Sequence, residues 1–131
     1  MQSIDTNVVV RLVVQDDEAQ ARRAEDVFRK ALGADGVRMT PLVLAETVWV
    51  LRSGYRFERS KIVEVLQWLL AIEGLTVESD SEVRAALAAF ETGPADFADY
   101  LILESARTAR GIPLWTFDKN LALSIGAQMV P

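Results

Sequence analysis

The chain has 131 residues, with 14 lysine and arginine residues against 19 aspartate and glutamate residues, a formal net charge of −5, and no histidine or cysteine. The two missing residue types exclude a histidine general base, a Ser-His-Asp triad, a cysteine nucleophile, a disulfide and a zinc site built from Cys or His. If the protein is an enzyme, we expect carboxylates as its acid–base and metal-binding groups, and these suit hard cations such as Mg²⁺ or Mn²⁺.

The length predicts a single domain over residues 1–131, and the content of 50% apolar and 25% charged residues is typical of a soluble globular protein. The first residues reach Asp5 without a basic region, so we expect no signal peptide. The longest apolar run, residues 85–90, is too short to span a bilayer. We therefore expect a cytoplasmic protein that does not bind membranes.

The negative charge is concentrated in the second half of the chain. Residues 1–65 carry 10 basic and 10 acidic side chains, whereas residues 66–131 carry 4 basic and 9 acidic ones. A net acidic protein is a poor general binder of nucleic acid, because neutralisation of phosphates drives that binding. An enzyme whose bound metal supplies local positive charge is not excluded.

In the first half, short apolar segments that favour strands alternate with amphipathic segments that favour helices. Thr40 and Pro41 form a strong helix start, as N-cap and first helical residue. In chain order we expect a strand ending at residues 3–4, a strand or buried helix at 7–14, a helix at 18–32 stopped by Gly33, a strand at 37–39, a helix from Thr40 to about residue 52 stopped by Gly54, a helix at 59–71 and a strand at 75–77.

The second half continues the same alternation. We expect an alanine-rich helix at 81–91, a break at Gly93-Pro94, a helix capped by Asp96 or a neighbour that runs to 110, a strand at 114–117, a short helix at 120–125 and a strand at 128–130. This order predicts an α/β fold with a parallel sheet and helices on both of its faces. In such sheets, ligands bind at the carboxyl ends of the strands.

Two acidic residues directly follow expected strands. Asp5 comes after the first strand, and Asp118 comes after the strand at 114–117. Each could serve only as a helix N-cap, since Asp is among the preferred residues there. Each could also be a ligand at the edge of the sheet.

Glu46 is the most informative acid, because its helix neighbours are apolar. The residues three and four positions away are Leu42, Val43, Trp49 and Val50. A carboxylate on a buried apolar stripe needs a partner to offset its desolvation. A metal ion could be that partner, and an arginine such as Arg52 is the alternative.

Asp96 and Asp99 stand three residues apart at an expected helix start. Both positions are favoured by the helix dipole, so a purely structural role is open. Because Ile102 and Leu103 lie one turn beyond Asp99, we expect Asp99 to face the core and act as a ligand, with Asp96 as the cap. Gathered carboxylates repel, and two metals about 4 Å apart are a known arrangement for phosphodiester hydrolysis.

Four motifs, taken in order, resemble a known family: Asp5-Thr6-Asn7, the segment 44–51, the segment 95–99 and Thr116-Phe117-Asp118-Lys119. They are similar to those of the PIN-domain ribonucleases, above all the VapC-type toxins of bacterial toxin–antitoxin pairs. The resemblance covers essentially the whole chain. It implies a three-layer α/β/α sandwich with a five-stranded parallel sheet of order 3-2-1-4-5, in which Asp5 and Asp118 lie side by side.

The resemblance also implies a site and a reaction. Asp5, Glu46, Asp99 and Asp118 match the acids that bind Mg²⁺ or Mn²⁺ in the family and activate the water that cuts RNA. Supporting positions near these acids fall on Asn7, Thr116 and Asp96. Candidates for contact with RNA phosphates are Arg11, Arg52, Arg56 and Lys119, each of which could equally be ordinary surface charge.

Partners follow from the same resemblance. In the family, the helix pair that matches residues 41–71 helps to form a groove that binds a helix of the antitoxin protein, and the toxin forms a homodimer. Two alternatives stay open. One is a catalytically silent PIN-like binding module. The other is a receiver-like phosphoacceptor domain, although Asp5 has no second acid beside it and no lysine follows residue 119.

Overall fold

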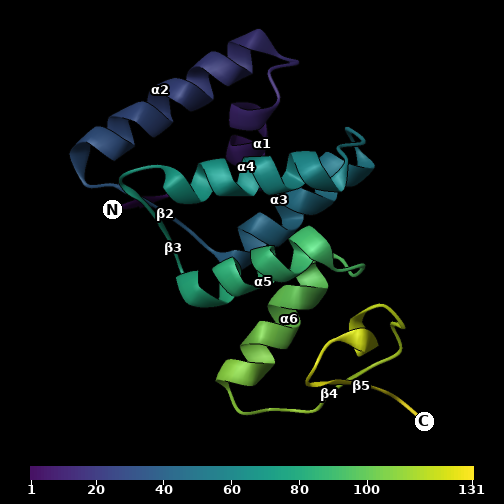
Figure 1. The fold of residues 1–131 in the computed structure, drawn as a ribbon. Coiled ribbons are helices and arrows are strands. Elements are labelled where there is room, and N and C mark those ends of the chain that lie inside the picture. Colours follow the sequence, from purple (N-terminus) through teal and green to yellow (C-terminus); the bar gives the residue numbers. More distant parts are fainter. The chain divides into compact units, whose positions relative to one another are not determined.

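The structure, a computed structural model, describes all residues from 1 to 131 (Figure 1). The chain divides into two compact units, Met1–Glu78 and Ser79–Pro131. Helices alternate with short parallel strands in both units, which confirms the predicted α/β class. None of the helices has the length and apolar character needed to cross a bilayer.

Three parallel strands form the sheet of the first unit, in the order β1-β2-β3. They are β1 (Gln2–Ser3), β2 (Val37–Met39) and β3 (Leu75–Val77). Gln2 pairs with Val37, and Val37 pairs with Leu75, so the three strands end at the same edge. Asp5 follows β1 at that edge.

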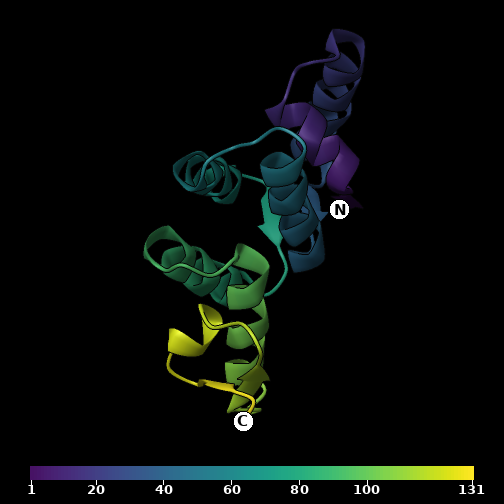
Figure 2. The same cartoon turned by 90° about the vertical axis from the view of Figure 1, so that its right-hand side faces the viewer.

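Four helices complete the first unit, and they can be followed in Figures 1 and 2. They are α1 (Thr6–Val13), α2 (Glu18–Ala34), α3 (Pro41–Ser53) and α4 (Arg59–Ala71). Helix α1 packs against α2 and α3, α2 packs against β2, and α4 packs against α3 and β3. The most deeply buried side chains of the unit include Val9, Leu44, Leu51, Ile62 and Leu69.

The structure answers two questions about this unit, namely the conformation of residues 7–14 and the end of α2. Residues 7–14, open between strand and helix, form α1 because Asp5 caps the helix by accepting a hydrogen bond from the Val8 amide. The expected stop of α2 at Gly33 is wrong, since the helix continues to Ala34. The chain turns instead at Gly36, whose φ of 87° favours glycine and whose β-carbon would lie 2.9 Å from the carbonyl oxygen of Gly74.

The second unit contains a pair of helices and a pair of parallel strands. Its elements are α5 (Asp80–Thr92), α6 (Phe97–Thr108), β4 (Leu114–Thr116), the 3₁₀-helix η1 (Leu121–Leu123) and β5 (Ala127–Met129). Phe90 of α5 meets Phe97 of α6 edge to face, with ring centroids 6.0 Å apart. Leu114 pairs with Ala127 in the two-stranded sheet.

Every element of this unit differs from its expected range, with α5 one residue longer at each end and β5 one residue earlier. Helix α6 stops at Thr108 rather than at residue 110, because Arg110 adopts a left-handed conformation with φ of 58°. Strand β4 ends at Thr116, and the helix expected at 120–125 is only the turn η1. The observed orders β1-β2-β3 and β4-β5 agree with the two parts of the expected order, and the β1–β4 pairing stays a prediction.

Candidate active site

In the first unit, Asp5 caps helix α1 and its neighbour Thr6 contacts Glu46. The Asp5 Oδ1 atom accepts a hydrogen bond from the Val8 amide at 3.2 Å, so the N-cap role is real. The next residue, Thr6, donates from its Oγ1 atom to Glu46 Oε1 at 3.2 Å. This contact joins the start of α1, which directly follows Asp5, to the middle of α3, which carries Glu46.

The buried apolar stripe expected around Glu46 is wrong. Glu46 is exposed, and its neighbours Leu42 and Trp49 are 68% and 70% exposed. The stripe of α3 that enters the core consists of Leu44, Thr47, Val48 and Leu51. Helical spacing shows which side chains share a face, but an apolar face need not be the packed one. Burial therefore does not explain why an acid stands at position 46.

Asp96 and Asp99 open helix α6 as a reciprocal capping box. The Asp96 side chain accepts a hydrogen bond from the Asp99 amide, and the Asp99 Oδ2 atom accepts one from the Asp96 amide at 3.3 Å. The expected cap role of Asp96 is confirmed. Two orphan amides at the helix start are thereby satisfied, and Asp99 is held in one orientation.

Asp99 is half-buried, and burial raises its pKa. The backbone hydrogen bond from Asp96 acts in the opposite direction, whereas the negative charges of Asp118 and Asp96 and a hydrogen bond with Asp118 raise the pKa further. Asp99 and Asp118 are thus close enough for their charges to interact. Such a pair favours either a shared proton or a bound cation.

Asp118 is fixed by the loop that follows β4. Its Oδ1 atom accepts hydrogen bonds from the amides of Asn120 at 2.8 Å and Leu121 at 3.2 Å. The Asp118 amide in turn donates to the Thr116 Oγ1 atom at 2.9 Å. Thr116 therefore holds the backbone that carries Asp118.

The sequence motifs assign no role to Thr6, and the supporting role expected of Asn7 stays a prediction. Asn7 forms no hydrogen bond with Asp5 or Glu46 and lines a groove between α1 and α2. Thr6 is the residue that contacts Glu46. A hydroxyl directly after a helix cap was the available signal, but the partner lies 40 residues away in the sequence.

The four basic candidates differ in their surroundings. Arg11 is ion-paired with Asp16, and Arg52 is half-buried in the last turn of α3. Arg56 and Lys119 are exposed and have no ion-pair partner. Lys119 directly follows Asp118, so its charge lies next to a predicted ligand.

The ligand chemistry of these groups suits a hard divalent cation, because every candidate donor is an oxygen. Glu46 accepts a hydrogen bond from Thr6, which directly follows Asp5, and Asp99 interacts with Asp118. The structure contains no group of three or more carboxylates that could hold a metal. Within each unit, hydroxyl and backbone contacts hold the candidate donors.

Comparison with known families places these residues in context. The PIN domain family matches residues 3–123, a range that includes all four acids and most of each unit. No curated protein matches the chain. The chain therefore belongs to the PIN domain family, whose members are generally nucleases that use divalent metal ions.

Proposed function

We propose that the chain is a single PIN domain over residues 1–131 that acts as a Mg²⁺- or Mn²⁺-dependent endoribonuclease, the VapC-type toxin of a toxin–antitoxin pair. The observation that carries the proposal is the interaction of Asp99 with Asp118 in the second unit. In the first unit, Glu46 accepts a hydrogen bond from Thr6, the residue that follows Asp5. Family membership supplies the chemistry for which such pairs are suited.

Asp5, Glu46, Asp99 and Asp118 would hold the cation. A bound divalent cation lowers the pKa of a water nucleophile and offsets negative charge on the phosphate. The chain contributes the placement of the donors. Thr6 orients Glu46, the capping box orients Asp99, and Thr116 fixes the loop of Asp118. Burial is the main cause of the raised pKa of Asp99, and the repulsion from Asp118 and Asp96 that adds to it would be offset by a cation.

Cleavage of a labelled RNA in Mg²⁺ or Mn²⁺, with and without EDTA, tests the function. We expect cleavage by the wild-type chain, none in EDTA, and a loss of at least about a hundredfold in Asp5→Asn and Asp99→Asn. Glu73→Gln is the control, since Glu73 is an exposed acid without an ion pair. Cleavage that persists in EDTA or in both site variants contradicts the proposal. Absence of both cleavage and Mn²⁺ binding supports the silent binding module instead.

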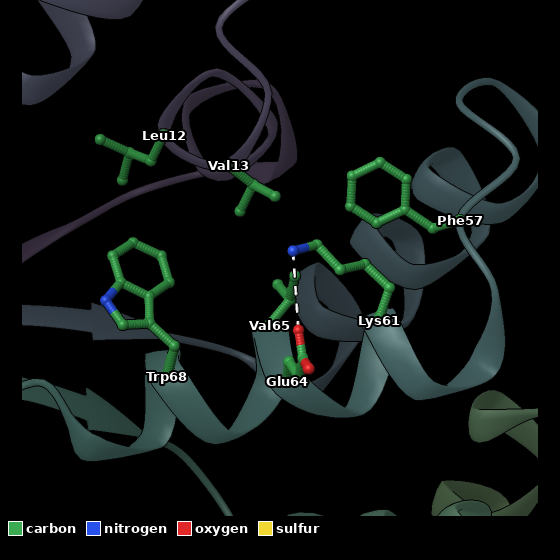
Figure 3. A pocket seen from close by; sticks show the side chains of 7 residues that line it. All are labelled: Leu12, Val13, Phe57, Lys61, Glu64, Val65 and Trp68. Carbon is green, nitrogen blue, oxygen red and sulfur yellow. Dashed lines mark ion pairs between the residues drawn. The ribbon is translucent and has the colours of Figure 1, made fainter.

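An apolar groove in the first unit supports the proposed antitoxin partner. Figure 3 shows Leu12 and Val13 of α1 facing Val65 and Trp68 of α4, with Phe57 at one side of a cavity of about 350 Å³. Lys61 and Glu64 of α4 lie at the same cavity as an ion pair at 3.6 Å. Apolar walls with charged groups beside them suit an amphipathic helix.

The groove continues past α1 toward α2. A second hollow of about 310 Å³ shares Leu12 and Trp68 with the first and reaches Phe28 and Leu32 of α2. We propose that the antitoxin helix lies along both hollows, so that α1 and α2 contribute beside the residues 41–71. Trp68→Glu should leave RNA cleavage intact but prevent the cognate antitoxin from inhibiting it. Full inhibition of this variant by the antitoxin would show that the antitoxin does not bind in this groove. The proposed homodimer is tested separately, by sedimentation of the wild-type chain.

A further inference from the structure

A separate groove of about 330 Å³ lies between α1 and α2 and differs in character from the antitoxin groove. Its polar lining comes from both helices, namely Asn7, Arg11, Gln20 and Arg23, with Val8 and Val27 among its apolar lining. No acidic side chain lines it. Two arginines line the groove, and because Arg11 is ion-paired with Asp16, the uncompensated positive charge there is that of Arg23.

The two arginines of this groove differ in their exposure and in their partners. Arg11 is half-buried and ion-paired with Asp16, and the Tyr55 hydroxyl donates to the same carboxylate at 3.0 Å. Arg23 is exposed and has neither an ion pair nor a side-chain hydrogen bond. One guanidinium is therefore held in place, and the other is free to bind an anion.

The groove begins next to a predicted catalytic acid. Asn7 and Val8 belong to the first turn of α1, and the Val8 amide donates to Asp5. Arg11 follows Asp5 by six residues, so its backbone lies roughly 9 Å farther along the helix at 1.5 Å per residue. A nucleic-acid strand that places one phosphate near Asp5 can therefore place a neighbouring nucleotide in the groove.

We propose that this α1–α2 groove binds the RNA substrate beside the bond that is cut. Arg23 and Arg11 contact phosphate oxygens, Asn7 and Gln20 offer amide groups to sugar or base, and Val8 and Val27 contact the face of a base. Apolar contact with a base face requires an unstacked base, so the substrate is single-stranded at this point. The inference rests on the proposed ribonuclease function and assigns to it Arg23 and Gln20, which the sequence motifs do not include.

The experiment compares two adjacent arginines of α2. Arg22 and Arg23 are both exposed, but only Arg23 lines the groove. In the cleavage-defective Asp99→Asn chain, the affinity for a fluorescent single-stranded RNA is measured over a range of NaCl concentrations. We expect Arg23→Ala to weaken binding about five- to tenfold and to reduce the slope of log affinity against log salt by about 0.7 to 1, because one phosphate contact is lost. Arg22→Ala should change neither quantity measurably.

A neutral variant separates the charge of the groove from its shape. Gln20→Ala should weaken binding a few-fold without changing the salt slope, because no charge is removed. Equal RNA affinities of the Arg22→Ala and Arg23→Ala variants would show that the α1–α2 groove does not bind the RNA. The proposed ribonuclease function would still stand if the wild-type chain cleaves RNA. If Arg23→Ala instead changes the sedimentation of the chain, the groove is a protein interface and the inference is wrong. Absence of cleavage by the wild-type chain contradicts the ribonuclease function itself.

Discussion

Asp99 couples the acidic pair of the second unit to pH. Its folded-state pKa is raised above the ordinary value of 3.8, mainly by burial. The folded chain therefore holds this proton more tightly than the unfolded chain, and the free energy of unfolding decreases as the pH rises through 3.8 to the raised folded-state pKa. A metal-free chain at neutral pH lacks the stability that protonation of Asp99 gives it in acid.

Asp99→Asn should remove this pH-dependent loss. In EDTA at pH 7 we expect the variant to be more stable than the wild-type chain, and the difference should disappear at pH values below the pKa of the unfolded state. The amide oxygen of asparagine can still accept the hydrogen bond from Asp96, so the cap is retained. Urea unfolding between pH 3 and pH 7 measures the difference. A gain in stability that is the same at every pH, or is shared by Glu73→Gln, would show that Asp99 is not its source.

Asp5 combines a structural role with a proposed chemical one, and two substitutions separate them. Asp5→Ala removes the acceptor for the Val8 amide and should cost about 1 kcal/mol of stability. Asp5→Asn keeps an N-cap acceptor and should unfold at or above the wild-type temperature, yet lose RNA cleavage. Thermal unfolding in EDTA and cleavage in Mn²⁺ are measured on both variants. If Asp5→Asn is destabilised as much as Asp5→Ala, the carboxylate itself is needed for the fold.

At the level of elements, the connection between α5 and α6 depends on a close contact. Tyr100 is buried, its hydroxyl accepts a hydrogen bond from the Ala95 amide at 3.2 Å, and a β-carbon at position 93 would lie 2.0 Å from that hydroxyl. Gly93 is therefore required by space and not by its backbone conformation, since its φ is −95°.

Gly93→Ala should destabilise the chain by about 1–3 kcal/mol, because either the tyrosine or the connection must move. Tyr100→Phe removes the atom closest to the added β-carbon, so the cost of Gly93→Ala should be smaller in that background. Urea unfolding of the two single variants and the double variant gives both values. Equal costs in the two backgrounds would contradict the proposed contact.

Elements with strong local signals were predicted well. The helix at 59–71 and the strands at 37–39 and 75–77 agree with the structure residue for residue, and Thr40 and Pro41 begin α3 as expected. The end of α2 was predicted wrongly because the turn at Gly36 depends on a distant residue: a β-carbon at position 36 would lie 2.9 Å from the carbonyl oxygen of Gly74. The sequence around Gly33 does not reveal that contact. The helix expected at 120–125 ends at Leu123, because Ser124 is extended with φ of −79° and ψ of 142°.

At the scale of the whole molecule, the proposed function assigns metal binding to acids that belong to each of the two units. Binding of Mn²⁺ to the folded chain should raise its stability by about 2.7 kcal/mol when the free metal is at 100 times its dissociation constant. We expect this gain to be lost in both Asp5→Asn and Asp99→Asn. Thermal unfolding with and without Mn²⁺ measures it, with Glu73→Gln as the control. Loss in only one of the two site variants would restrict metal binding to one acidic pair.

The candidate site was predictable as a set of acids but not as a set of contacts. The ordered motifs locate Asp5, Glu46, Asp99 and Asp118, and the family match includes all four. Apolar neighbours suggested a buried Glu46, whereas its surroundings are exposed and its partner is Thr6. That contact spans 40 residues, and only the packing of α1 against α3 creates it.

The three tryptophans of the chain are exposed enough for their fluorescence to report on binding. Trp49, Trp68 and Trp115 are 70%, 47% and 53% exposed, so all three indoles already contact water in the folded state. Their fluorescence should change little when the chain unfolds and strongly when something covers them. Trp68 lines the groove proposed for the antitoxin, and in a chain carrying Trp49→Phe and Trp115→Phe it would be the only tryptophan. A shift of its emission toward the blue would then report that something has covered the groove.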